Sequence, residues 1–340
     1  MPACFLVVTA DDFGLSPSLN EAVLRAAEHR TLTSASLLPA MPFALPALKA
    51  ARLRAPEMGI GLHLTLTSGP SVLPHDEIPL LTDSQGHFRH GFASLYLALH
   101  AASAASRAEF RRQVLLEWFA QLARFRDLHS EFGFPADHLD SHQHIHLIPG
   151  LDDVFWQVFD HGRKTFRWVP RLPMERYGSA CRILRHLPAW FPAGLAKRLI
   201  LNHFGARTLR RHRLNRVGFP NYFGILDSGK MDLRAGLPLL TAFSSSSAFS
   251  SSSAFSASVH SQGQLVAELN LHPSVDACLD PACVCSEGDR QFHLSPWRQR
   301  EFEFLMASEF QAALEKNGVQ LVPFHALPLR EDAFRLPARK

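Results

Sequence analysis

Three histidines follow an aspartate at intervals of two residues: Asp140, His142, His144 and His146. Side chains on a β-strand alternate between its two faces, so if 137–146 is a strand, all four project to one face. Burying four ionisable groups side by side is costly unless they hold a cation or move protons. The spacing therefore favours a metal or proton-transfer site over a purely structural role.

Two other strand-like segments end in residues that can do chemistry. Asp11 and Asp12 close the apolar run 4–10, and a turn after them would let both carboxylates reach one cavity; a solvated turn with an aspartate helix cap is the plainer alternative. Two carboxylates with different neighbours can divide the work, one staying ionised on a metal and the other taking a proton from water. His63 alternates with leucines in 61–67, which puts it on the polar face of that segment.

A fourth segment, 268–273, places Glu268, Asn270 and His272 on one face and leucines on the other. A histidine that closes a strand late in the chain is a candidate general acid, and alone it is as easily a structural residue.

The four segments together offer a mixed oxygen and nitrogen donor set. Asp12, His63 and His142 suit zinc or a similar divalent ion and leave positions open for water and substrate. This combination predicts a hydrolytic metal centre.

The elements that must position these residues alternate between strand and helix. Strands are expected at 4–10, 34–38, 58–66, 137–146, 265–271 and 319–324, and helices from Ser16 or Ser18 to about His29, over 105–130 and over Pro296–Asn317. Such alternation predicts a parallel sheet or barrel, in which polar residues at the carboxyl ends of strands line the site. We expect one catalytic domain over 1–340.

Composition excludes several classes of protein. The 340 residues are 46% apolar and 19% charged, too hydrophobic for a disordered chain, and the net charge of +4 is too weak for a dedicated nucleic-acid binder. Five cysteines, an odd number, favour free thiols in a reducing compartment. The start lacks a basic leader, and no apolar run reaches the ~20 residues of a membrane span. We therefore expect a cytoplasmic location.

Three segments stand apart from this pattern. The stretch 176–226 has ten Lys or Arg and no acidic residue, and we read it as a basic helical excursion: a solvated cover, or an element that touches anionic lipid at the inner membrane. The Ser/Phe repeat in 242–263 predicts a flexible insertion. Cys278, Cys283 and Cys285 have zinc-binding residue types at an unconventional spacing.

The motifs resemble, in order and spacing, those of the YdjC-like carbohydrate deacetylases, and most closely the branch associated with hopanoid biosynthesis. The resemblance runs from about residue 4 to 325 and rests on the segments Thr9-Ala10-Asp11-Asp12-Phe13-Gly14, Gly61-Leu62-His63-Leu64-Thr65-Leu66-Thr67-Ser68-Gly69, Leu139-Asp140-Ser141-His142-Gln143-His144-Ile145-His146 and Glu268-Leu269-Asn270-Leu271-His272-Pro273.

The resemblance implies an α/β fold of the distorted TIM-like barrel type and removal of acetyl from an N-acetylated sugar. It implies one divalent ion, zinc or magnesium, on Asp12, His63 and His142, with Asp11 as base and His272 as acid. Arg167 is expected to orient Asp11 or the substrate. A supporting or substrate-facing role is expected for a further group, comprising Asp140, His144, His146 and Glu268.

The substrate implied is an N-acetylglucosaminyl group on a hopanoid lipid. Soluble N-acetylated chito-oligosaccharides, a non-catalytic barrel that binds lipid or sugar, and a metal phosphoesterase are the alternatives. We expect no nucleic-acid partner, and the sequence leaves the oligomeric state open, a homodimer being one option.

Overall fold

The computed structural model describes residues 3–100, 103–175, 191–214, 219–244, 259–260, 264–277, 287–327 and 334. Its strands are β1 (Cys4–Phe13), β2 (Ser34–Leu37), β3 (Gly59–Leu64), β4 (Ala136–Ser141), β5 (Val169–Pro170), β6 (Asn221–Phe223), β7 (Val259–His260), β8 (Gln264–Leu271) and β9 (Val319–Leu321). They form one sheet in the order β5-β4-β3-β2-β1-β8-β6. Every pairing is parallel except that of β7 with β8, and β9 adds to β1.

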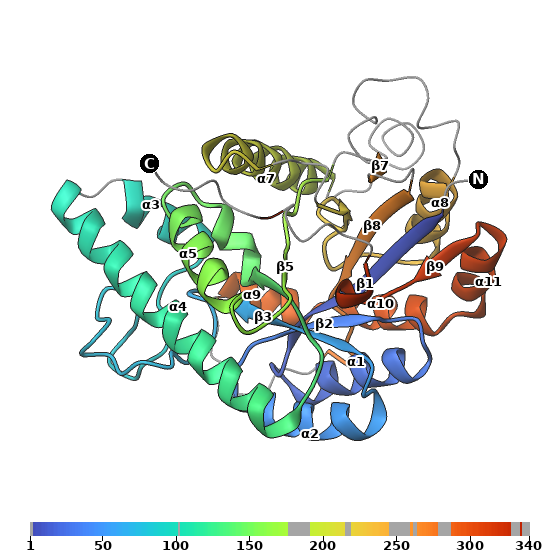
Figure 1. Cartoon of the computed structure of the whole chain (residues 1–340), viewed down its shortest axis with the longest axis horizontal. Helices are drawn as coiled ribbons and strands as arrows, with labels where there is room; N and C mark the ends of the chain where they lie inside the picture. The colour runs from blue at the N-terminus through green and yellow to red at the C-terminus, as the bar shows by residue number, and fades with distance from the viewer. Residues whose placement is uncertain are drawn as a thin grey trace.

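Helices connect the parallel strands and surround the curled sheet (Figure 1). They are α1 (Pro17–Glu28), α2 (Ala44–Arg54), α3 (Phe92–His100), α4 (Ala104–Phe132), α5 (Asp152–Gly162), α7 (Phe191–Arg211), α8 (Leu233–Ser244), α9 (Glu287–His293), α10 (Trp297–Met306) and α11 (Ser308–Lys316), with short 3-10 helices η1 (His142–Leu147) and η5 (Phe324–Ala326). Parallel strands need such crossovers, and the result is the expected α/β fold, a distorted TIM-like barrel.

The central strand β1 shows how the core and the site share one sheet. Val8 and Ala10 alternate with Thr9 and Asp11, and all four are almost fully buried. One face of the strand therefore packs apolar side chains while the other carries polar groups into the barrel. Full burial of a large apolar side chain stabilises the folded state by roughly 1.5–3 kcal/mol, and this gain offsets the cost of burying the polar groups.

The end of β1 departs from regular strand geometry. The pairing of β1 with β2 shifts between Ala10 and Phe13, and Asp12 has φ 66°, in the left-handed region that aspartate tolerates better than most residues. The irregularity lets the neighbours Asp11 and Asp12 both face the interior, as the expected turn required.

Two expected elements are shorter than predicted. The strand expected over 137–146 ends at Ser141, and η1 follows, with Gln143 and His144 at positive φ, so the side chains after Ser141 do not alternate. The helix expected over Pro296–Asn317 is two helices, because the backbone at Ala307 is extended.

The basic excursion is helical only in part. Helix α7 lies within it, but β6 is a buried strand of the barrel, so the excursion does not reach Leu226. Arg207 and Arg211 of α7 pair with Asp152 and Asp153 of α5, at 2.9 and 2.6 Å, which neutralises part of the basic run.

The other two unusual segments fall largely outside the described residues. Within 242–263, Phe243 is buried in the last turn of α8 and 259–260 form β7, so those parts belong to the fold. Residues 245–258 and 261–263 lie outside the described residues, as do Cys278, Cys283 and Cys285.

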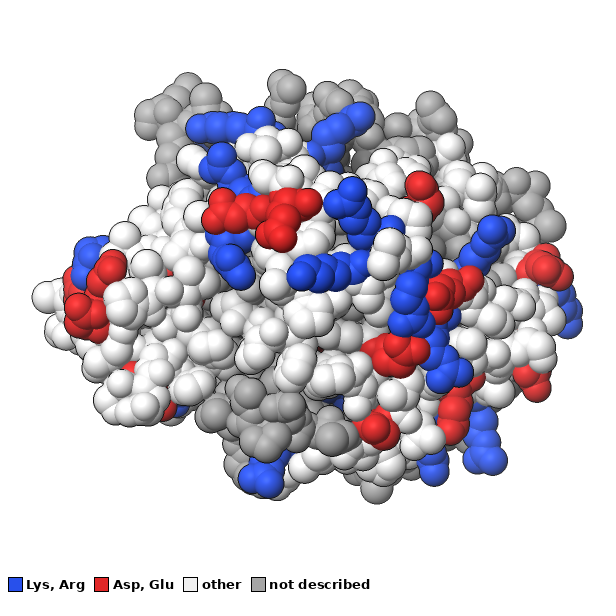
Figure 2. Space-filling model, turned by 90° about the horizontal axis from the view of Figure 1, so that it is seen from below, with Lys and Arg blue, Asp and Glu red and all other residues white. Residues whose placement is uncertain are grey.

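The surface carries mixed charge. On the face in Figure 2, basic and acidic side chains lie among one another and do not form a patch of one sign, in keeping with the small net charge. Among the helices searched, which are those of the described ranges, none combines the length and the apolar character needed to cross a bilayer.

The start of α1 gives a test of the local sequence signals. Ser16 Oγ accepts a hydrogen bond from Leu19 N at 3.3 Å, so Ser16, and not Ser18, caps the helix. We expect Ser16→Ala to lower the free energy of unfolding by about 1 kcal/mol, because it leaves a buried N–H without its acceptor. Ser18→Ala is the matched control and should change it by less than about 0.5 kcal/mol. Equal losses in urea unfolding would refute the assignment of the cap.

Candidate functional site

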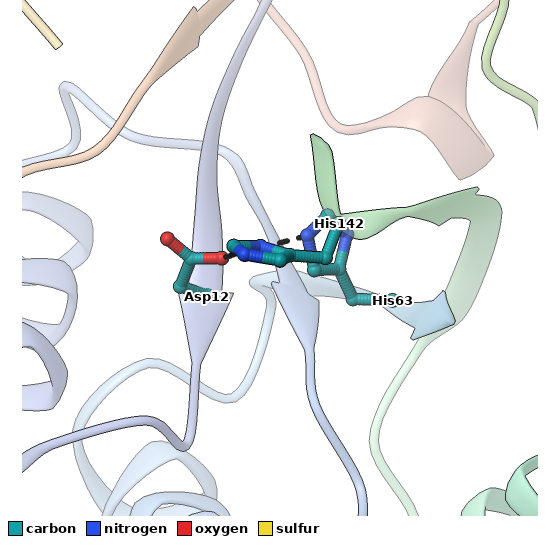
Figure 3. Close-up of side chains that lie close together, drawn as sticks. All are labelled: Asp12, His63 and His142. Atoms are coloured by element: carbon teal, nitrogen blue, oxygen red, sulfur yellow. Dashed lines mark hydrogen bonds and ion pairs between the residues drawn. The ribbon is translucent and has the colours of Figure 1, made fainter. Parts of the chain in front are cut away.

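Three side chains from separate elements converge inside the barrel (Figure 3). Asp12 ends β1, His63 lies near the end of β3, and His142 begins η1 directly after β4. Asp12 Oδ1 lies 2.8 Å from His142 Nδ1 and 3.5 Å from His63 Nε2, and one ligand atom from each residue lies within 4.8 Å of the others. All three are at least 95% buried. The structure thus brings together the residues that the sequence predicted as metal ligands.

The donor set fits a divalent cation. His63 Nδ1 lies 2.8 Å from Asp140 Oδ1, which orients the ring, while the buried Nε2 has no hydrogen-bond partner among the described residues. A carboxylate behind a histidine is a frequent support for a metal ligand, since it fixes the tautomer and leaves the second nitrogen for the ion. One carboxylate with two imidazoles is a set that zinc and similar ions accept.

The raised pKa of His63 shows that its surroundings favour positive charge, as a cation site requires. Burial alone would lower its pKa, but the carboxylates of Asp140, Asp12 and Asp11 outweigh burial and raise the pKa to about 9. In the metal-free protein a proton therefore occupies His63 at neutral pH, where a divalent ion would compete with it.

A buried guanidinium lies next to this cluster. Arg171, directly after β5, donates from Nη1 to Asp11 Oδ1 at 2.7 Å, also contacts Asp140 Oδ2, and donates from Nε to Glu268 Oε1 at 2.7 Å. Arg167, for which an orienting role is expected, is exposed, whereas the guanidinium that contacts Asp11 is that of Arg171. Arg171 follows the carboxyl end of its strand, and that position is the signal that could have identified it.

The three carboxylates that contact Arg171 differ in the direction of their pKa shifts. Burial would raise the pKa of Asp11 and of Asp140, but the Arg171 guanidinium and His63 together outweigh burial and hold both below their ordinary values. For Glu268, burial outweighs the same cation and raises the pKa to about 7. Asp11 is therefore an ionised carboxylate at neutral pH.

His272 closes the opposite side of Asp11. Its Nε2 lies 3.8 Å from Asp11 Oδ2, and Asn270 Nδ2 donates to that same oxygen at 3.0 Å. Burial lowers the pKa of His272 to about 3, against the pull of the nearby carboxylates, so the imidazole is neutral at rest.

A buried pair from α10 fixes the backbone of this histidine. Glu301 Oε2 accepts from His272 N at 2.6 Å, and Arg298 Nε donates to His272 O at 2.8 Å. Arg298 also reaches Asp12 Oδ2 at 3.5 Å. The sequence pattern places Asn270 on the face of His272 but gives it no role, and it does not identify Arg298, which is almost fully buried on the largely polar helix α10.

His144 and His146 do not share a strand face with His142, because β4 ends before them. His146 Nδ1 lies 2.7 Å from Ser141 Oγ and its Nε2 3.2 Å from Arg171 O, and burial lowers its pKa to about 4. The ring of His144 meets Tyr222 edge-on at 5.8 Å, and burial, followed by the charge of Lys197 on α7, lowers its pKa. His146 therefore supports Arg171, whereas His144 lies between the site and α7.

Two other acidic and histidine clusters occur in the described part of the chain. Asp11, His63 and Asp140 form one, and Asp152, Asp153 and His212 the other. In both, arginine already neutralises the carboxylates: Arg171 in the first, Arg207 and Arg211 in the second. The Asp12 cluster is therefore the best metal site of the three.

The sequence and the fold are similar to those of known proteins. A family model described as YdjC-like protein matches residues 5–316. A carbohydrate deacetylase of Mus musculus is 33% identical over 99% of this chain and 99% of its own length, and one of Homo sapiens is 29% identical over 99% and 95%. A solved structure from Enterococcus faecalis V583, described as a candidate cellobiose-phosphate cleavage protein, aligns with a TM-score of 0.58 at 22% identity, covering 95% of this chain and 98% of that one. The last likeness concerns the fold alone.

The proton on His63 predicts how metal affinity depends on pH. Below a pKa of about 9 the ion must displace that proton, so the apparent affinity should rise as the pH is raised toward 9 and then level off. Calorimetric metal titrations in buffers of different ionisation enthalpy should show proton release at pH 7. Affinity that does not change between pH 6 and 8, without proton release, would contradict this assignment.

Proposed function

This chain belongs to the YdjC-like family and is an enzyme of the carbohydrate deacetylase class, a hydrolase of amide C–N bonds, and from this premise we propose that it removes acetyl from an N-acetylglucosaminyl group with one bound divalent ion. The observation that carries the proposal is the position of Asp11, ionised and held by Arg171, beside the Asp12, His63 and His142 cluster.

Each part of the site has a proposed role. Asp12, His63 and His142 hold the ion, zinc or magnesium, which when bound polarises the acetamide carbonyl and lowers the pKa of water. The Asp11 carboxylate accepts a proton from the attacking water. Arg171 keeps Asp11 ionised and fixes its direction, and Asn270 binds its other oxygen.

His272 is proposed to protonate the departing amine. Because its imidazole is neutral at rest, it must first gain a proton, and Asp11 Oδ2, 3.8 Å from Nε2, is a source close by. The proton taken from water then passes to the amine nitrogen as the C–N bond breaks, so acetate and a free amine leave. His144 is proposed to face the substrate, and His146 to support the backbone of Arg171. Asp140 orients His63, and Glu268 binds the guanidinium of Arg171.

The proposed substrate is a lipid-linked sugar of the hopanoid type, with peripheral contact to an anionic membrane. Two features of helix α7 support this. Burial and then the charge of its Lys197 lower the pKa of His144, and the helix exposes Leu199 and Ile200, at 59% and 44%, next to Arg198, which is half-buried and donates to Glu175 O. Basic and bulky apolar residues on one helix suit a lipid surface. The pairing of Arg207 and Arg211 with α5 leaves less free charge for such contact than the sequence indicated.

Paired substitutions separate the proton-transfer role from metal binding. Asp11→Asn should keep the metal but lose ~10²-fold or more in kcat, because the amide cannot accept the proton. His142→Ala should lose both metal and turnover, because a ligand is removed. Elemental analysis and acetate release measure the two effects. Full activity of Asp11→Asn would reassign the base, and full metal occupancy of His142→Ala would reassign the ligand.

A substrate comparison tests the finer proposal. We expect mass spectrometry to show loss of one acetyl group from N-acetylglucosaminyl-hopanoid in anionic vesicles, faster than from a soluble N-acetylated chito-oligosaccharide. Faster reaction of the soluble sugar would support that alternative. Binding without acetyl loss from either would support a non-catalytic barrel, and release of inorganic phosphate from phosphorylated sugars would indicate a phosphoesterase.

A further inference from the structure

A second polar group lies in the barrel beneath Asp11, on strands β2 and β4. The pairing of β3 with β4 runs from Ile60 opposite Ala136 to Leu62 opposite Leu139, so Asp137 and His138 together oppose one residue of β3. This bulge turns both neighbouring side chains toward the interior, a common effect of bulges near active sites.

Two glycines of β3 make the space for them. A Cβ placed on Gly59 would overlap the carboxylate of Asp137, and a Cβ on Gly61 would overlap the ring of His138. Both side chains are fully buried. A buried aspartate and histidine in a cavity made by two glycines is a costly arrangement that the reaction scheme above does not use.

These groups form a continuous hydrogen-bonded chain that ends on Asp11. Asp137 Oδ1 lies 2.6 Å from His138 Nδ1, His138 Nε2 lies 2.8 Å from Ser36 Oγ, and Ser36 Oγ lies 3.2 Å from Asp11 Oδ1. Arg171 Nη1 donates to the same Ser36 oxygen at 2.9 Å. The chain therefore ends on the same Asp11 oxygen that Arg171 contacts.

The order of groups is that of a nucleophilic Ser-His-Asp triad, but its setting excludes that use. Ser36 and His138 are fully buried, and the serine oxygen is enclosed by Asp11, Asp140 and Arg171, so no substrate carbonyl can reach it. The serine acts on another side chain, Asp11, instead of on a substrate.

The far end of the chain is anchored. Asp137 Oδ2 accepts from Ser34 Oγ at 2.9 Å and from Phe324 N at 3.1 Å, while Oδ1 faces His138. Burial would raise the pKa of Asp137, but His138 and then His325 outweigh it and lower the pKa to about 2, so Asp137 is a carboxylate that accepts the Nδ1–H of His138. The direction of the ring is thereby fixed. Because Ser36 has a single hydroxyl proton, which it donates to Asp11 Oδ1, the chain requires that His138 Nε2 donates to the Ser36 oxygen.

We propose that Ser36 and His138 are positioning residues for the reaction: anchored on Asp137, they hold the Asp11 carboxylate in the orientation in which it accepts a proton. A catalytic group must be held within about 0.5 Å of its productive geometry, and Arg171 and Asn270 alone constrain Asp11 from only two directions. Ser36 supplies the third.

The kinetic test rests on the proposed deacetylase activity and has a control outside the chain. Ser36→Ala and His138→Asn should each lower kcat about tenfold, with KM within about twofold and metal content unchanged, the scale of one lost positioning hydrogen bond. Thr31→Val removes an equally buried hydroxyl, which bonds Ala26 O and no member of the chain, so it should lower the melting temperature comparably yet keep kcat within about twofold.

Two further variants distinguish positioning from packing. The double variant Ser36→Ala/His138→Asn should lose no more than either single variant, because the residues act in series. His138→Gln should recover part of kcat, since its amide can reach Ser36. A kcat loss in Thr31→Val equal to that in Ser36→Ala, or losses that multiply in the double variant, would overturn the proposal.

A spectroscopic readout separates this inference from the deacetylase proposal. In histidine-labelled protein, the Nδ1–H proton of His138, in its short bond to Asp137, should resonate far downfield and shift in Ser36→Ala and in Asp11→Asn. If the wild type releases no acetate but these shifts occur, the proposed reaction fails and the chain to Asp11 stands. No response to Asp11→Asn would overturn the chain, whatever the activity.

Discussion

The interior of this barrel depends on Arg171. Its guanidinium is buried and contacts the carboxylates of Asp11, Asp140 and Glu268, which without it would lie close together in the interior with no opposite charge. Removing a buried partner of this kind typically costs 3–5 kcal/mol on the scale of buried ion pairs. The cation therefore supports both the folded state and the ionised state of Asp11.

The buried guanidinium of Arg171 lies beside the candidate metal site. These two positions for positive charge explain why the neighbouring aspartates Asp11 and Asp12 have different roles. Asp11 faces the guanidinium, whereas Asp12 faces His63 and His142 and has only a long contact with Arg298. Asp11 is thus already neutralised by the protein and is a weak competitor for a metal ion. Asp12 completes a ligand set, so adjacent residues of one strand serve different chemistry.

Sequence patterns predicted the site better than they predicted its surroundings. Asp12, His63 and His142 follow apolar runs, and the ends of parallel strands meet at one edge, so their convergence could be predicted. The guanidinium that contacts Asp11 could not be predicted, because it depends on which strand ends face each other across the barrel, and the sequence has both Arg167 and Arg171 close to β5. The break at Ala307 has no proline or glycine to mark it, and the bulge in β4 is a matter of register that alternation cannot reveal.

The left-handed backbone at position 12 restricts which residues can evolve there. Of the twenty residue types, glycine, asparagine and aspartate accept φ 66° at least cost, and of these only aspartate brings a charge. Most substitutions would therefore disturb the strand as well as the chemistry, so few residue types can replace Asp12 without effect. Asparagine alone preserves both the shape of the side chain and the backbone, so Asp12→Asn would remove the charge at this position while leaving the end of the strand in place.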